Sequence, residues 1–125
     1  MKFKEWHPCI MLFSPGELDA RLEQCLQAVD LQYLLARGAG WEQVQPWQET
    51  LSGGEKQRLA MARLLYHQPQ YAVLDECTSA VSADGEFKLY EACERSGITL
   101  LSIAHRPALK RFHDVIIHFV SDANP

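Results

Sequence analysis

The chain has 125 residues, which is the size of one small domain or of part of a larger one. Apolar residues make up 47% of it and charged residues 22%, proportions that are ordinary for a globular protein and argue against a disordered chain. The net charge of -4 argues against nucleic acid as a partner.

The sequence predicts neither a signal peptide nor a membrane-spanning helix. Apolar runs such as 98–101 and 115–117 fall far short of the roughly 20 residues that a membrane-spanning helix needs. The apolar run 9–13 is shorter than a signal-peptide core of about 7–15 residues. The cysteines form no close pair, so we expect reduced thiols rather than disulfides or a zinc site: Cys9, Cys25, Cys77 and Cys93.

A helix is predicted to begin at Ser14, because a serine cap, a proline in the first turn and a glutamate three positions later form a helix-start pattern. The residues before it, 1–13, show no clear period and are left unassigned. Apolar residues recur at helical spacing up to a predicted end at Gly38: Leu18, Leu22, Cys25, Leu26, Val29 and Tyr33. A polar loop over 40–50 follows, with its tryptophans, Trp41 and Trp47, as expected anchors.

Ser52-Gly53-Gly54-Glu55 is a second capping-box pattern and predicts a helix that ends at Pro69. We expect one face of this helix to be apolar: Leu59, Ala62, Leu65 and Tyr66. The two glycines leave backbone N–H groups uncovered at the helix start, where the helix dipole favours a phosphate. An ordinary capped helix has the same pattern, so this segment alone does not identify a phosphate site.

The second half of the sequence alternates strands and helices, which predicts a parallel α/β sheet. Short apolar runs predict three buried strands: Tyr71–Leu74, Ile98–Ile103 and Val115–Val120. Between them we expect a helix that is capped by Ser82 or Asp84 and stopped by Gly97, and then a helical turn from Pro107.

Polar residues follow the first two of these strands. Asp75 and Glu76 would lie at the sheet edge where α/β folds bind ligands. In phosphate-transferring sites, one acid holds the Mg²⁺ shell and a second group orients the attacking water. His105 would reach the same edge and hydrogen-bond a phosphate or that water. The competing interpretations are an acidic loop start and a structural histidine.

Taken together, these segments resemble the ATPases of the ABC family. The run 51–57 resembles their signature motif, 71–76 their Walker B strand, 79–84 their D-loop, and His105 their switch histidine, in the family's order and spacing. The resemblance implies an α/β fold that is part of a P-loop NTPase domain of the RecA-like type. Residues 14–70 would belong to the helical signature subdomain and 71–125 to the ATPase core.

The family's site residues then follow from the matching positions. The resemblance implies that Glu76 polarises the hydrolytic water, that Asp75 acts on Mg²⁺ and that His105 senses the γ-phosphate of ATP. The signature residues that would contact nucleotide on a partner cassette are Ser52, Gly53, Gly54 and Gln57, and the D-loop residues are Ser79, Ala80, Val81 and Ser82. The implied partners are a second cassette and the transmembrane domain of the parent transporter.

The run 75–82 resembles more narrowly the fatty-acid half-transporters of the peroxisomal membrane, subfamily D. Most cassettes have alanine where Cys77 stands, and leucine-aspartate in place of Val81-Ser82. The resemblance implies transport of long-chain fatty acids or acyl-CoA into peroxisomes, with the chain on the cytosolic face of that membrane. A related bacterial transporter of another substrate stays open.

None of the seven glycines precedes a lysine, so the chain carries no G-x-x-x-x-G-K-[ST] phosphate-binding loop. We therefore expect a C-terminal fragment of a cassette whose sheet lacks the P-loop strand, and a chain that is inactive by itself. Two other interpretations compete with this one. A truncated cassette that acts only as an interaction partner stays open, whereas a chromosome-maintenance ATPase is disfavoured because no sustained heptads precede Leu51.

Overall fold

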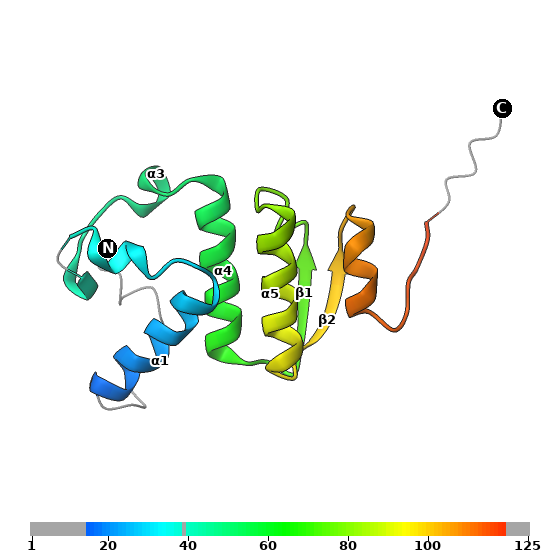
Figure 1. Cartoon of the computed structure of the whole chain (residues 1–125), viewed down its shortest axis with the longest axis horizontal. Helices are drawn as coiled ribbons and strands as arrows, with labels where there is room; N and C mark the ends of the chain where they lie inside the picture. The colour runs from blue at the N-terminus through cyan, green and yellow to red at the C-terminus, as the bar shows by residue number, and fades with distance from the viewer. Residues whose placement is uncertain (1–14, 39, 120–125) are drawn as a thin grey trace.

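The computed structural model describes residues 15–38 and 40–119 and shows helices packed with one small parallel sheet. In Figure 1, α5 lies between α4 and the two strands, and the helices of the first half gather at one end. The α/β class is confirmed. The elements in chain order are α1 (Pro15–Ala28), α2 (Tyr33–Ala36), η3 (Gly40–Glu42), α3 (Trp47–Thr50), α4 (Gly53–His67), β1 (Tyr71–Asp75), α5 (Ala83–Arg95), β2 (Thr99–Ile103) and η4 (Pro107–Phe112).

The sheet consists of β1 and β2, which run parallel in a register from Tyr71 opposite Thr99 to Asp75 opposite Ile103. The first two predicted strands and their parallel connection through α5 are therefore confirmed. The predicted burial of these strands holds for Leu74 but is wrong for the other face of β1, where Tyr71 and Val73 are each 69% exposed. Successive side chains of a strand point to opposite faces, and the described helices cover only the face that carries Leu74.

The third predicted strand is absent from the described residues. Residues 115–119 belong to no sheet, and Val120 lies outside the described part. An apolar run becomes a strand only where a neighbouring strand pairs with its backbone N–H and C=O groups. Without that pairing, Val115, Ile117 and Phe119 are 78%, 70% and 93% exposed.

The first helix is shorter than predicted, because α1 ends at Ala28 instead of continuing to Gly38. Asp30 adopts a left-handed φ of 54°, and its N–H bonds to Gln27 O at 3.1 Å while Leu31 N–H bonds to Leu26 O at 2.8 Å. This pair of bonds is a Schellman motif, for which Asp is one of the few tolerated non-glycine residues. The motif places the side chain of Leu31 in the core, where it is fully buried. The predicted cap, Ser14, lies outside the described residues.

The core lies between α1, α4 and α5 and takes in the loop that follows α2. The apolar face predicted for α4 is confirmed, as is the anchoring of the loop by Trp47, which is buried, and Trp41, which packs on the core partly buried. The loop itself contains the short helices η3 and α3. Cys25 and Cys93 are buried free thiols as expected, and burial raises the pKa of Cys93 to about 12.

Within residues 15–38 and 40–119, no helix has both the length and the hydrophobicity to cross a membrane.

Candidate functional site

The turn that opens α4 forms the predicted capping box. Ser52 Oγ accepts a hydrogen bond from Glu55 N at 3.2 Å, and Glu55 Oε2 accepts one from Ser52 N at 2.8 Å. A serine hydroxyl that accepts one bond keeps its own proton to donate, and the first N–H groups of a helix need no intrahelical acceptor. Ser52 and Gly53 are exposed, so this turn presents donors to an anion from outside the chain.

Glu55 is the buried anchor of this turn. Besides Ser52 N–H, it accepts the Tyr33 hydroxyl at 2.5 Å, and Arg37 lies 3.6 Å from its Oε1. The bond from Tyr33, followed by that from Ser52, lowers the pKa of Glu55 to about 2 from a usual 4.5. A carboxyl whose pKa is lowered by folding stabilises the fold above its unfolded pKa, and this contribution is lost as the pH falls through the folded value.

We therefore expect the stability of the chain to decline from about pH 4.5 towards pH 2, with Glu55 as one contributor. Tyr33→Phe removes the donor with the largest effect, so it should raise the pKa of Glu55 and reduce the stability near pH 6 more than the stability near pH 3. Urea unfolding followed by circular dichroism across this range measures the effect. Tyr71→Phe, at a tyrosine 69% exposed, is the matched control. An equal loss for Tyr33→Phe at both pH values would contradict the assignment.

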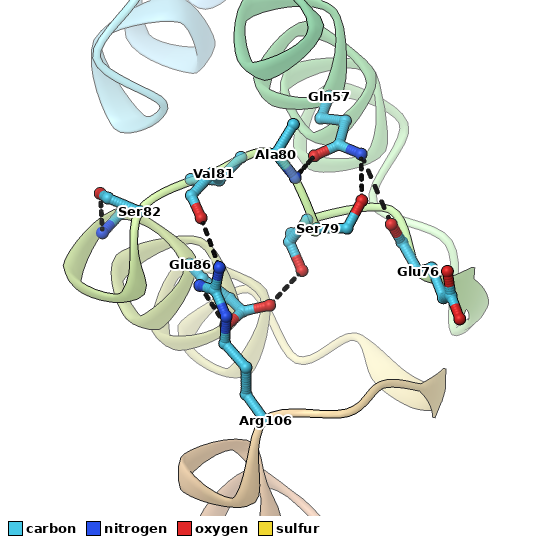
Figure 2. A network of polar contacts seen from close by, with 10 residues as sticks. Gln57, Glu76, Ser79, Ala80, Val81, Ser82, Glu86 and Arg106 are labelled. Carbon is cyan, nitrogen blue, oxygen red and sulfur yellow. Dashed lines mark hydrogen bonds and ion pairs between the residues drawn. The ribbon is translucent and has the colours of Figure 1, made fainter.

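Gln57 joins α4 to residues 79–82, the segment that we call the D-loop after the motif that it resembles (Figure 2). Its Oε1 accepts Ala80 N–H at 2.7 Å, and its Nε2 donates to Ser79 Oγ at 3.0 Å and more weakly to Glu76 O at 3.5 Å. The two segments approach closely at Gly54, where an added Cβ would lie 2.9 Å from Ala80 O. The second signature glycine is thus required by packing as well as by the helix start.

The carboxyl ends of the two strands bring Glu76 and His105 together. Glu76 follows β1 in a left-handed conformation with φ 45°, and its N–H bonds to Ile103 O at 2.9 Å. Its Oε1 lies 2.7 Å from His105 Nε2, an ion pair whenever the imidazole is protonated. Both side chains are largely open to solvent, at 52% and 84% exposed, so a ligand can reach them.

Asp75 is exposed at the same sheet edge, one residue before Glu76. Carboxylate oxygens are the ligands that Mg²⁺ prefers, and this ion commonly takes one or two carboxylates together with substrate phosphates and waters. The described residues hold no group of three or more His, Cys, Asp or Glu side chains that would form a closed metal cage. Asp75 offers one exposed carboxylate, which suits an ion that takes its other ligands from phosphates and water.

The D-loop has a second set of contacts, which sequence reasoning missed. Arg106 donates through Nη1 to Glu86 Oε2 and through Nη2 to Val81 O, both at 2.9 Å (Figure 2). The other oxygen of Glu86, Oε1, accepts a bond from Thr78 Oγ1 at 2.5 Å. In the sequence, Glu86 is one more acid in the first turn of a helix, where acids are usually solvated. Ser82 is the cap of α5, with Oγ accepting Gly85 N–H, which decides between the two predicted caps.

A cavity of about 500 Å³ opens between the signature turn and the D-loop. Ser52, Gly54 and Arg58 line it from α4, Ala80 and Val81 from the D-loop, and Lys88 from α5. The position of the D-loop therefore sets the shape of the space beside the signature residues.

The sequence also matches a known protein family. Residues 3–79 match the sequence model of the family described as ABC transporter, which is more than half of the chain. The chain belongs to the ABC transporter family. The match includes residues 3–13, for which no element could be predicted, and the fold of the family is that of a P-loop NTPase.

Curated ABC transporter relatives confirm the resemblance to subfamily D. The chain is 50% identical over 109 residues to "ATP-binding cassette sub-family D member 3" of Homo sapiens, covering 87% of this chain and 16% of that protein. It is 50% identical over 104 residues to "ABC transporter D family member 2" of Dictyostelium discoideum, covering 83% and 14%. A protein of Homo sapiens named as a lysosomal cobalamin transporter is 43% identical over 101 residues, covering 79% and 17%. The chain thus spans about one sixth of the length of these relatives.

Proposed function

We propose that this chain forms part of the nucleotide-binding domain of an ABC transporter that couples ATP binding and hydrolysis to transport across a membrane. The observation that supports this most directly is the pairing of Glu76 with His105 at the carboxyl ends of β1 and β2. The helix that begins at the signature turn is hydrogen-bonded to the residues just after Glu76, since Gln57 bonds to Ser79 and Ala80. One short stretch of backbone, 76–80, thereby connects the groups that would act on the chain's own nucleotide with the helix whose first turn would contact the nucleotide of a second cassette.

The proposal gives each of these residues a separate role in ATP binding or hydrolysis. Glu76 accepts a proton from the attacking water and orients it, and His105 holds the Glu76 carboxylate until a terminal phosphate takes its place as partner. Asp75 holds the Mg²⁺ of a Mg-ATP complex, and this ion neutralises charge on the phosphates when it is bound. The hydroxyl of Ser52 and the N–H groups of Gly53 and Gly54 donate to the γ-phosphate on a second cassette.

The proposed partners follow from that division of roles. The exposed signature turn needs a nucleotide that another cassette binds, and we propose a homodimer or heterodimer of cassettes for this reason. Transport also requires a membrane domain, which the parent protein would supply.

For the substrate, we propose long-chain fatty acids or acyl-CoA, moved across the peroxisomal membrane with the chain on its cytosolic face. This is supported by the resemblance of residues 75–82 to the peroxisomal half-transporters and by the identity with sub-family D proteins. The relative named as a lysosomal cobalamin transporter favours a second candidate, transport of cobalamin across the lysosomal membrane, at lower identity. Uptake of labelled acyl-CoA and of cobalamin by vesicles that contain the intact transporter separates the two.

The test of the ATPase proposal compares two proteins in a phosphate-release assay with Mg-ATP. We expect an intact cassette containing this chain to hydrolyse ATP. The 125-residue chain alone should release no phosphate above background, because its sequence has no P-loop to position the γ-phosphate, and positioning supplies most of the catalysis in this reaction. An intact cassette without turnover would favour the non-enzymatic alternative. Turnover by the short chain that Glu76→Gln abolishes would contradict the assigned need for a P-loop.

A further inference from the structure

The D-loop is held from two opposite sides at adjacent residues. From α4, Gln57 accepts the N–H of Ala80. From the other side, Arg106 donates to the carbonyl of Val81. We call Thr78, Glu86 and Arg106 the D-loop clamp, because these three side chains form the second attachment (Figure 2).

The clamp is built around a buried charge. The side chain of Glu86 is only 5% exposed, and each of its oxygens has a separate donor: Thr78 on Oε1 and Arg106 on Oε2. A buried carboxylate is tolerated only when it is paired and hydrogen-bonded, so these contacts are interdependent. Glu86 lies on the first turn of α5, and α5 packs on the sheet. Through Glu86 the position of the D-loop is therefore fixed relative to the sheet.

Arg106 makes the connection that matters most for the site. Its two terminal nitrogens reach two different acceptors, Glu86 and the Val81 carbonyl, a geometry that a planar guanidinium supports and a single ammonium does not. Arg106 also follows His105 directly in the chain, and His105 contacts Glu76. The residue next to His105 in the chain is therefore hydrogen-bonded to the D-loop, at Val81 O.

We propose that Arg106, Glu86 and Thr78 are positioning residues that set the D-loop against the signature turn and couple its position to that of His105. This inference rests on the proposed ATPase function. The side-chain bonds of these three residues run among themselves and to Val81 O. They act through Val81 and Ala80, which line the cavity beside Ser52 and Gly54.

The test uses the intact cassette, with turnover and ATP binding measured separately. Arg106→Lys keeps the charge but cannot hold both acceptors, and Thr78→Val removes one donor at nearly constant shape. We expect each variant to lower kcat between about tenfold and a hundredfold, since small misplacements have effects of this size, with the KM for ATP changed less than about twofold. Thr78→Ser restores the hydroxyl and should recover most of the lost rate.

Arg111→Lys is the matched control, because Arg111 lies over the Phe87 and Phe112 rings and touches neither Glu86 nor the D-loop. A second measurement, hydrogen exchange at the amides of Ala80 and Val81, should show faster exchange in both clamp variants and no change in the control. This readout holds even where a variant is less stable, because exchange across α4 reports global opening separately.

The inference is overturned if Arg106→Lys and Thr78→Val keep the kcat of the unchanged cassette, or if kcat falls with no local change at Ala80 and Val81. Equal loss in Thr78→Ser and Thr78→Val also overturns it. An unchanged cassette that does not hydrolyse ATP contradicts the proposed function instead. In that case faster exchange at Ala80 and Val81 in the clamp variants still decides whether the clamp holds the D-loop.

Discussion

Glu76→Gln in an intact cassette is expected to reduce ATP hydrolysis by about a hundredfold to ten-thousandfold, the contribution typical of a general base. Glutamine keeps the size of the side chain and its bond to His105 but cannot take the proton of the attacking water. Nucleotide contacts stay intact, so ATP should accumulate in a closed dimer of cassettes. Gel filtration with Mg-ATP, combined with a phosphate-release assay, measures both effects.

Ser52→Arg should also abolish ATP hydrolysis, but by preventing the dimer from closing instead of trapping it closed. It places bulk and charge in the exposed turn where the partner's phosphate would dock, so the dimer should fail to close. Glu94→Gln, at an exposed carboxylate near the end of α5, is the matched control and should behave like the unchanged cassette. If Glu76→Gln and Ser52→Arg elute alike with ATP, the division of roles between the carboxylate and the signature turn is wrong.

The second large effect concerns the uncovered face of the sheet. Tyr71 and Val73 on β1 and Leu101 and Ile103 on β2 are between 54% and 69% exposed, and they form one apolar surface on neighbouring strands. Exposed apolar strands of this kind promote association. The 125-residue chain by itself is therefore expected to form assemblies at micromolar concentration, as measured by light scattering.

Val73→Thr combined with Leu101→Thr should shift the chain towards monomer, while its stability changes by only about 0.5 kcal/mol because both side chains are exposed. Leu74→Ala on the same strand is the contrasting variant. Leu74 is 6% exposed, so its truncation should reduce stability by about 2–5 kcal/mol without reducing association. Unchanged scattering in the threonine variant, or strong amide protection across residues 115–119, would show that another surface or a further strand controls association.

The sequence by itself determined the features that depend on neighbouring residues. The capping box of Ser52 and Glu55 could be predicted because both partners lie within one turn of helix. The strand before Asp75 and Glu76 could be predicted because its apolar run is short and ends in acids. The parallel pairing of β1 with β2 followed from the helix between them. The order and spacing of these segments sufficed to indicate the family.

Only the tertiary structure decided the features whose partners are distant in the chain. Arg106 and Glu86 are 20 positions apart, and no local pattern marks Glu86 as buried. The break at Asp30 depends on Leu31 finding space in the core, which periodicity alone does not reveal. The run 115–119 has a strand's composition but pairs with no strand in the described part of the chain. Burial and backbone pairing each require two surfaces in contact. The sequence of one segment describes only one of those surfaces, so it cannot predict whether the other is present.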